Sequence, residues 1–571
     1  LSAVRFKASI LDRFPQVTPR KSNFTRKFTD LSGPHVQRRK DTCILPQTKW
    51  TRPPHEGASM SATKLHAIGP LDGRYRGRLD DVSTHFSEYA YIKHRVEVEI
   101  EYFIALISIS PPLKELASVK PEPALIDKLR KIYTEFNDAD AEWVKQTEFR
   151  GGAPGGPPLA TNHDVKAVEY FLKHKFTQIS QEAGLGELLR VKEFIHFGLT
   201  SQDVNNTCYP LMIQRFFKNV YLPKLAQIIT TLDTFARHWG EIPLLARTHG
   251  QPASPTRMGK EIMVFVARLK SQVELLDQVP HCAKFGGATG NMNAHKVAYP
   301  DRDWPAFANA LIEGMGLQRY QCTTQIEHYD NMAALFDGCR RVDTILIDLC
   351  RDVWTYISQG LFKQKTKAGE IGSSAMPHKV NPIDFENAEG NFGVASALFE
   401  FFSGKLPISR LQRDLTDSTV TRNIGVPFGH CIVAFDSLLK GLNKLKIDER
   451  AIAADLNSHW EVTAEAIQTV LRREQVDGAY ELLKEETRGE VVTEQTVAGF
   501  VDKLEKHPTI KLGAGVIAEL RAITPSSYTG FFDAGETLEA WSARKLSKTN
   551  QGNVAASIAK QREALVDAFN Y

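Results

Sequence analysis

Three long stretches of the sequence carry apolar residues at every third or fourth position, and this pattern most constrains the fold. They cover residues 209–239, 258–279 and 332–362, and their only internal prolines are Pro210 and Pro223. Such a period predicts amphipathic helices, each about 33–46 Å long at roughly 1.5 Å per residue. Helices of this length suit a long bundle, and strand-like alternation is scarce elsewhere. The sequence therefore predicts an all-α fold.

The overall composition is that of a soluble globular protein. A chain of 571 residues with 42% hydrophobic and 24% charged residues can bury a large core, and its length suggests roughly three to four domains. The longest apolar runs fall short of the ~18 residues that a membrane span needs. Seven cysteines without a Cys-x-x-Cys pair argue against a zinc site or a disulfide framework and favour a reducing compartment. We therefore expect no membrane partner, no metal and no cofactor.

Residues 1–59 differ from the rest of the chain in charge. They carry twelve lysines and arginines against four acidic residues, so the remainder is mildly acidic and lacks the basic footprint of a nucleic-acid-binding domain. A basic, acid-poor head is typical of an organelle transit segment, which directs a protein to a plastid or mitochondrion. The equal alternative is a cytoplasmic protein translated from Met60, which precedes the first patterned segment.

Residues 372–382 combine polar side chains with residues that break helices. The run reads Gly-Ser-Ser-Ala-Met-Pro-His-Lys-Val-Asn-Pro. If buried, its hydroxyl, imidazole, ammonium and carboxamide groups would each need a partner, and Pro377 and Pro382 block a helix. We interpret the run as a loop that displays catalytic groups. A plain solvated turn is the weaker alternative, because no acidic residue stands between 371 and 383.

Two more polar clusters stand beside predicted long helices. Residues 247–252 place His249 between two such helices, where a structural histidine competes with a catalytic one. Residues 196–203 precede another predicted long helix. Thr200 and Ser201 suit either helix caps or an anion site at the start of that helix.

The last two clusters contain charged residues. Residues 162–166 (Asn-His-Asp-Val-Lys) open a helix. Their purely structural interpretation is that Asn162 caps the helix and that His163 is solvated. Residues 410–423 hold three arginines and adjacent hydroxyls, which suit a clamp for a phosphate or carboxylate. An arginine–aspartate network that uses Asp414 and Asp417 is the competing account.

Three other features carry structural expectations only. Residues 151–158 (Gly-Gly-Ala-Pro-Gly-Gly-Pro-Pro) cannot be helical and are expected to be flexible or extended. Residues 541–571 form a polar, weakly amphipathic tail, either a peripheral helix or disordered. In the third long stretch, Asp343, Asp348 and Asp352 are expected to be solvated or salt-bridged rather than catalytic.

Taken together, these motifs resemble the adenylosuccinate lyase branch of the fumarase/aspartase superfamily, in its bacterial and plant-like form. Residues 372–381 are similar to the superfamily signature Gly-Ser-Ser-x-Met-Pro-x-Lys-x-Asn, and His378 in a variable position is similar to this branch. The resemblance spans about residues 65–534. It is nearly residue for residue over 161–172, 247–255, 363–391 and 406–423.

The resemblance implies an all-α subunit of three domains with a long central helical bundle. Four copies would form a homotetramer with a twenty-helix core and with active sites shared between subunits. The implied divisions are a basic extension at 1–59, a helical N-terminal domain at 60–189, the central bundle at 190–448, a helical C-terminal domain at 449–540 and the tail at 541–571.

The resemblance also implies a carbon–nitrogen lyase of AMP and IMP biosynthesis. Such an enzyme eliminates fumarate from adenylosuccinate to give AMP and from the succinylated carboxamide ribotide SAICAR to give AICAR. Ser373 would be the base that removes the proton, and Lys379 would stabilise the carbanion. His249 would be the acid for the leaving nitrogen, kept charged by Glu386. The implied residues for the nucleotide substrates are Arg74, Tyr75, His163, Asp164, Thr200, Ser201, Gln325, Asn381, Arg413, Ser418 and Arg422.

The chain departs from the family pattern at three places. Gln202 stands where glutamate is usual, residues 326–330 read Ile-Glu-His-Tyr-Asp in place of Ile-Glu-Pro-His-Asp, and the insert at 151–158 directly precedes His163. Two alternatives stay open. A sibling such as argininosuccinate lyase acts on a phosphate-free substrate and would not need the arginine clamp. A non-catalytic helical scaffold would have no reason to keep all four catalytic candidates.

Overall fold

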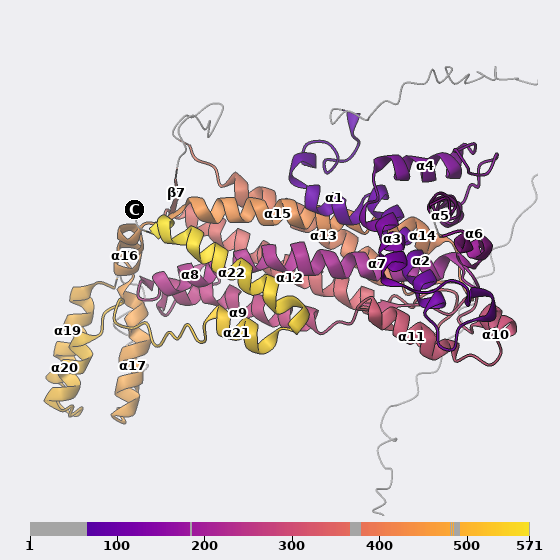
Figure 1. Ribbon diagram of the computed structural model, residues 1–571. Coiled ribbons are helices and arrows are strands. Elements are labelled where there is room, and N and C mark those ends of the chain that lie inside the picture. Colours follow the sequence, from indigo (N-terminus) through magenta and orange to yellow (C-terminus); the bar gives the residue numbers. More distant parts are fainter. Residues whose placement is uncertain are drawn as a thin grey trace, which may run out of the picture. The chain divides into compact units, whose positions relative to one another are not determined.

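The computed structural model describes residues 66–182, 185–365, 379–479, 481, 484 and 492–569 (Figure 1). The chain divides into two units, residues 1–61 and 62–571, and every described residue lies in the second. The basic head therefore lies outside the described residues, as does most of the predicted catalytic loop, including Ser373 and His378.

Five long helical rods pack side by side and form the core (Figure 1). They confirm the prediction of an all-α bundle, and the three predicted stretches match helices to within a few residues at most ends. The rods are α7 (Ser201–Phe216) continued through a π-helical turn (Phe217–Tyr221) into α8 (Leu222–His238), α9 (Met258–Asp277), α12 (Asp330–Ser358), α13 (Ile383–Lys405) and α15 (Gly425–Lys444).

The two internal prolines do not break the first rod. Pro223 is an early residue of α8, and the π-helical turn ends two residues before it. Proline has no N–H group and its ring crowds the carbonyl four residues earlier, which here belongs to Asn219 inside that turn. A wider turn relieves this crowding, so the helix continues with a local bulge.

Aromatic side chains fill the centre of the bundle. Phe428 on α15 is fully buried and its ring lies 5.1 Å from that of Phe216, 5.2 Å from Phe399 and 5.5 Å from Phe86. These four rings come from four separate helices. Aromatic pairs at such distances add to the free energy gained by burial, so this cluster ties the rods together.

A second hydrophobic cluster joins the N-terminal helices to two short helices that precede α12. Fully buried Phe103, Phe171 and Trp304 belong to it. The helices of this region are α2 (Glu88–Ile107), α3 (Pro123–Thr134), α4 (Asp138–Phe149), α5 (Asp164–Ser180), α6 (Glu187–Val191), α10 (Asn293–Ala298) and α11 (Trp304–Gly314), with 3₁₀ turns at Lys114–Leu116 and Lys192–Phe194. A 3₁₀ turn at Arg76–Arg78 and α1 (Asp80–Phe86) come before them, and Val82 and Phe86 of α1 pack in the main core instead.

The C-terminal helices have a small core of their own. Ile467, Leu471, Val501 and Leu520 meet in it, each at most 1% exposed. The helices of this region are α16 (Glu449–Asn457), α17 (Ala464–Arg473), α19 (Glu494–Glu505) and α20 (Ala514–Ala522), with a 3₁₀ turn at Trp460–Thr463.

The polar tail is a helix packed on the bundle. It forms α21 (Leu538–Lys545) and α22 (Lys548–Phe569), and α22 runs along α8 (Figure 1). Trp541, Val554 and Ile558 are at most 2% exposed and belong to the main core. Of the two expectations for this segment, the helix is confirmed and disorder is wrong.

Short pairs of hydrogen-bonded strands connect the loops between helices. Strands of two or three residues lack the length at which alternation becomes visible in a sequence. They are β1 (Pro243–Leu244) with β4 (Thr256–Arg257), β2 (Arg247–Thr248) with β3 (Gln251–Pro252), β5 (Cys282–Ala283) with β6 (Gln318–Arg319), and β7 (Phe362–Gln364) with β8 (Leu445–Ile447); only the β5–β6 pair is parallel.

The glycine–proline insert contains no helix, as predicted. It is anchored rather than free, because Trp143 Nε1 donates a hydrogen bond to the carbonyl of Pro154 at 3.0 Å. At Gly155 φ is +73°, and an added Cβ would lie 2.4 Å from Nδ1 of His174. The insert therefore has one defined path between α4 and α5.

The aspartates of α12 divide into different environments. Asp348 forms the expected ion pair with Arg268 at 2.6 Å. Asp343 contradicts the expectation, because it is fully buried and its carboxylate accepts from the thiol of Cys431 at 3.5 Å. Burial raises the pKa of Asp343 well above its usual range, and the side chain is part of the core.

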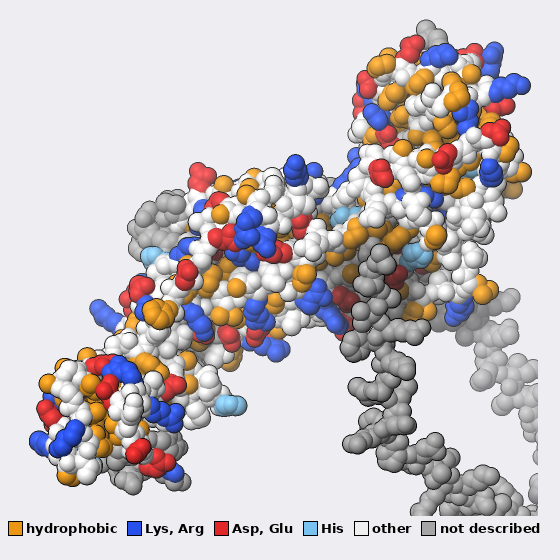
Figure 2. All heavy atoms as spheres, turned by 90° about the horizontal axis from the view of Figure 1, so that it is seen from below, with side chains coloured by type: hydrophobic (Ala, Val, Ile, Leu, Met, Phe, Trp, Pro, Cys, Tyr) orange, Lys and Arg blue, Asp and Glu red, His pale blue; other side chains and the backbone are white. Residues whose placement is uncertain are grey.

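Charged side chains of both signs are interspersed over the face of the protein drawn in Figure 2. No helix in the described ranges combines the length and the hydropathy of a membrane span. The described side chains also contain no group of three or more His, Cys, Asp or Glu arranged to hold a metal ion.

Candidate functional site

The N-terminal end of α7 gathers several of the predicted substrate residues. Thr200 is the N-cap residue and Ser201 the first residue of α7. Ser201 Oγ lies 3.3 Å from Nε2 of His163, which is itself the N-cap of α5. His163 Nδ1 accepts the backbone N–H of Lys166 at 3.1 Å, so the histidine and not Asn162 caps this helix. Two helix starts thus face each other, with an exposed imidazole and a hydroxyl group in contact between them.

Asp164 is held between two arginines beside this pair of helix starts. Its carboxylate lies 2.9 Å from Arg95 and 2.8 Å from Arg422. Burial alone would raise the pKa of Asp164, but the charges of Arg95 and Arg422 and the N–H of Val165 lower it to about 2. Arg95 is 1% exposed, so it fixes Asp164, and Asp164 orients the half-exposed Arg422.

The other two arginines of residues 410–423 are also paired with carboxylates. Arg413 lies 3.4 Å from Asp417, and Arg410 lies 3.0 Å from Asp414. The arginine–aspartate network is therefore present. It does not exclude an anion clamp, because the Arg413 side chain is 19% exposed and the Arg422 side chain 41% exposed.

Arg413 is aligned by two amide side chains. It donates to Oε1 of Gln325 at 3.5 Å, and the buried Gln202 amide presents its oxygen to the same guanidinium at 2.5 Å in the orientation that satisfies both groups. Ser418 follows on α14 (Thr416–Thr421), where its N–H donates to Asp417 at 2.7 Å. The departure from the family pattern at Gln202 thus lies in direct contact with a predicted substrate residue.

A buried ion pair between Asp203 and Lys284 holds the start of α7 in place. The sequence interpretation gave neither residue a role. Both are 0% exposed and form an ion pair of 2.7 Å. Asp203 also accepts the N–H groups of Thr200 at 2.8 Å and Gly286 at 2.7 Å. The signal for Asp203 was present, since an acidic residue three positions after a threonine cap suits a capping box. No comparable signal identified Lys284.

Glu327 forms a second support behind Gln325. Its N–H donates to Asn206, and its Oε2 accepts the N–H of Tyr329 at 2.7 Å. Asn206 in turn donates to the Tyr329 hydroxyl at 2.7 Å, and that hydroxyl donates to Asp417 at 3.2 Å. A hydrogen-bond chain therefore runs from Glu327 to the partner of Arg413.

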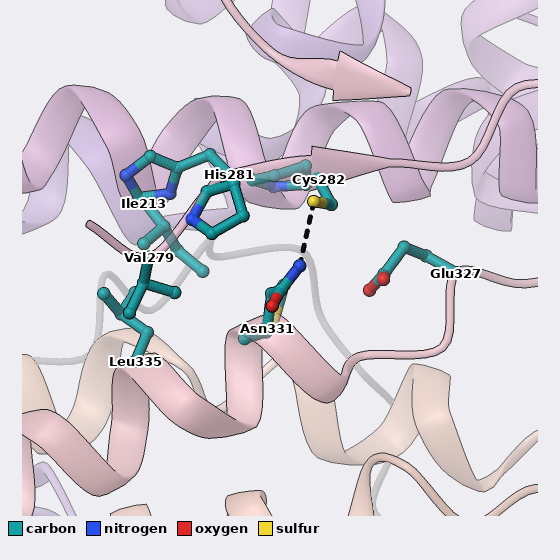
Figure 3. Close-up of a pocket in the computed structure, with 10 residues that line it drawn as sticks. Ile213, Val279, His281, Cys282, Glu327, Asn331 and Leu335 are labelled. Atoms are coloured by element: carbon teal, nitrogen blue, oxygen red, sulfur yellow. Dashed lines mark hydrogen bonds between the residues drawn. The ribbon is translucent and has the colours of Figure 1, made fainter. Parts of the chain in front are cut away.

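Glu327 also borders a small enclosed cavity (Figure 3). The cavity measures about 10 Å³, which is room for one water molecule. Its wall includes Cys282, whose sulfur accepts from Asn331 at 3.1 Å. Burial raises the pKa of Glu327 to about 8, and its Oε1 has no hydrogen-bond partner among the described residues.

A second set of predicted residues lies at the N-terminal end of α13. Glu386 is in its first turn and accepts from Trp354 at 3.1 Å, and Lys379 and Asn381 directly precede the helix. One residue after Glu386, Asn387 donates to the Tyr75 hydroxyl at 3.2 Å. That hydrogen bond is the main cause of a lowered pKa at Tyr75, which follows the exposed Arg74.

His249 occupies the tight turn between β2 and β3. It is exposed, with φ at +56°. Arg247 anchors the hairpin to α16 through two hydrogen bonds to Asp455 of 2.7 and 2.8 Å. Among the described residues, no hydrogen bond joins His249 to Glu386.

The predicted residues therefore form two groups in one chain. The α7 group is His163, Asp164, Thr200, Ser201, Gln325, Arg413, Ser418 and Arg422. The α13 group is Arg74, Tyr75, Lys379, Asn381 and Glu386. His249 belongs to neither and lies on the β2–β3 hairpin, which is anchored to α16. Glu386 and Lys405 stand about 29 Å apart at roughly 1.5 Å per residue of α13. Lys405 donates to Thr416 at 2.9 Å, so α14 of the first group lies at the far end of that helix.

The chain matches two family profiles. A lyase family covers residues 73–395, and an adenylosuccinate lyase C-terminal family covers residues 409–529. Among solved structures, the 3-carboxy-cis,cis-muconate lactonizing enzyme from Pseudomonas putida has a similar fold, with a TM-score of 0.56 and 19% identity over 84% of this chain and 97% of that one.

Curated relatives share much more of the sequence. The adenylosuccinate lyase of Dictyostelium discoideum is 54% identical over 83% of this chain and 98% of its own length. The adenylosuccinate lyases of Legionella pneumophila (strain Corby) and Escherichia coli (strain K12) are 45% and 44% identical, each over 82% of this chain and 98% of theirs. These matches and the two profiles show that the chain is a lyase and belongs to the adenylosuccinate lyase family.

Proposed function

We propose that this protein eliminates fumarate from adenylosuccinate to give AMP, and from SAICAR to give AICAR, as an enzyme of purine nucleotide biosynthesis. The observation that carries the proposal is the α7 group in a chain of this family. Arg413 and Arg422 are held in place by carboxylates and remain partly exposed beside the start of α7. Guanidinium groups and a helix N-terminus together favour a phosphate.

The chemistry assigns separate roles to the four catalytic candidates. Ser373 removes the proton beside a succinyl carboxylate, and Lys379 with Asn381 stabilises the resulting aci-carboxylate. His249 protonates the nitrogen as the carbon–nitrogen bond breaks. Glu386 keeps His249 charged through opposite-charge stabilisation. The chain supplies these groups without a metal or cofactor in any step.

The two groups require more than one chain to meet. We propose a homotetramer in which the α7 group of one subunit faces the α13 group of others. Five rods per chain give the twenty-helix core that four copies would share. The apolar side chains of Trp354, Val394 and Phe401 on α12 and α13 are 45–51% exposed, which supports burial against another copy. The division into domains at 60–189, 190–448 and 449–540 is part of the same proposal.

The activity test follows the absorbance change of purified protein on adenylosuccinate. We expect turnover by the wild type and severe loss in Ser373→Ala and His249→Ala, with Ser374→Ala and His507→Ala as matched controls that remain active. Robust activity in Ser373→Ala would contradict the base assignment. Turnover of argininosuccinate in place of adenylosuccinate would contradict the substrate, and no activity on either would favour the scaffold.

Shared sites have a separate test. If Ser373 and His249 of one site come from different chains, mixing the two inactive variants at equal amounts and reassembling them restores about a quarter of wild-type activity, because half of the positions of each kind are intact. Each variant reassembled alone is the control. Failure to recover any activity from mixed tetramers would place both residues in one chain.

A further inference from the structure

A cavity of about 510 Å³ lies beside α10 and α11, away from the residues assigned to catalysis. It is bounded by the loop at Gly290, by both short helices and by β6. On the other side of this loop, the carbonyl of Ala288 accepts from the predicted substrate residue Gln325 at 3.0 Å. Three cations reach the cavity, and its wall includes Met292, Lys296, Arg302, Trp304, Arg319 and Gln321.

Arg319 is the main charge of this cavity. Its side chain is 7% exposed, and its hydrogen bonds go to the carbonyl of Phe285 at 2.7 Å and to the amide oxygens of Asn309 and Gln321, both at 2.9 Å. None of the carboxylates in the described part of the chain forms an ion pair with it. Burial accordingly lowers the pKa of Arg319, so its charge is held at a cost in free energy.

The other two cations are held by backbone carbonyls. Lys296 donates to the carbonyl of Pro300, and Arg302 donates to that of Pro112 at 3.2 Å. Asp303 is the acidic residue of the cavity wall, and its carboxylate also caps α11 by accepting the N–H of Ala306 at 3.0 Å. The cavity wall therefore carries three positive charges and one negative charge, and a dianion would neutralise this excess of positive charge.

We propose that this cavity binds a small phosphate monoester, with the phosphate on Arg319, Arg302 and Lys296. A phosphate monoester carries close to two negative charges at neutral pH and accepts bidentate hydrogen bonds from guanidinium. The volume is in the range of small-molecule sites, and the exposed Pro305 offers an apolar contact to the organic part of the ligand.

The test measures binding of ribose 5-phosphate, which has a phosphate monoester but no purine and no succinyl group. Calorimetry is done in an Arg413→Gln background, which removes a cation from the proposed substrate site. Adding Lys296→Gln and Arg302→Gln should weaken binding at least about tenfold, because a hydrogen bond to a charged group contributes roughly 1.5–3 kcal/mol. The matched control adds Lys548→Gln and Lys560→Gln, two exposed cations on α22, and should change affinity less than about twofold.

Three outcomes would overturn the proposal. They are absence of ribose 5-phosphate binding in the Arg413→Gln background, equal binding in the two charge-matched variants, and equally tight binding of ribose itself. Circular dichroism of each variant checks that it is folded, and neither Lys296 nor Arg302 is buried. None of these readouts depends on lyase activity, so the proposed function can fail without affecting this result.

Discussion

The buried carboxyl of Glu327 should make the stability of the protein depend on pH in a specific way. Its pKa rises from an ordinary value of 4.5 to about 8 in the folded protein because burial disfavours the ionised form. Between these two values the folded state holds a proton that the unfolded state has lost. The free energy of unfolding must therefore fall as pH rises through this window.

The magnitude follows from the two pKa values. From pH 5 to pH 8 this single group removes about 3–4 kcal/mol from the free energy of unfolding. For a cooperative unit of this size, that corresponds to a fall of roughly 3 °C in Tm. Glu327→Gln keeps the shape and the acceptor for the Tyr329 N–H but cannot ionise. The variant should therefore lose this component of the pH dependence.

The assay compares wild type and Glu327→Gln by thermal unfolding at pH 5, 6, 7 and 8. The difference in Tm between them should grow in favour of the variant as pH rises, whatever other groups titrate in both proteins. Glu313→Gln, an exposed carboxylate on the neighbouring α11, is the matched control and should follow the wild type. A constant difference across this range would refute the reasoning and would mean that Glu327 is ionised inside the fold.

The remaining predictions concern packing and charge. Phe428→Ala should lower the free energy of unfolding by about 3–5 kcal/mol in urea denaturation, because it empties the centre of the aromatic cluster, whereas the fully exposed Phe531→Ala should be neutral. Asp164→Asn should lose about 2 kcal/mol at pH 7 and little at pH 2 in urea denaturation. A lowered pKa stabilises the fold in full above about pH 4, and this contribution is lost as the pH falls to about 2. Trp541→Ala should lower Tm, because the tail packs into the main core. Gly155→Ala should cost at least about 1 kcal/mol in urea denaturation, since φ is +73° and the methyl group would meet His174.

The long helices were predictable because a 3.6-residue period that repeats over twenty or more residues is specific to an amphipathic helix. The same criterion could not detect β2 and β3, which have two residues each, although their turn places His249. It also misjudged Asp343, because a polar residue inside an apolar stripe is assigned to the solvent side by default. Its actual partner, Cys431, is 88 residues away in sequence, and only the assembly of the bundle, in which α12 and α15 each pack against α13, brings the two together.

The candidate site shows the same limit at a larger scale. Residues within one motif, such as Thr200 and Ser201, could be interpreted locally because a helix start has known chemistry. Other parts of the site depend on contacts between segments that are far apart in sequence, and no local pattern predicts them. Examples are the Asp203–Lys284 ion pair and the series of hydrogen bonds from Glu327 to Asp417.

The arginines of residues 410–423 illustrate why two accounts of one motif need not exclude each other. A guanidinium without an anion would be costly to hold near a closed site, and one that is fully neutralised and buried would not bind substrate. Arg422 shares Asp164 with the buried Arg95 and also lies 3.5 Å from Glu88, yet its side chain stays 41% exposed. Pairing with carboxylates therefore fixes the orientation of the arginine, and its partial exposure leaves the guanidinium accessible to the phosphate of a nucleotide.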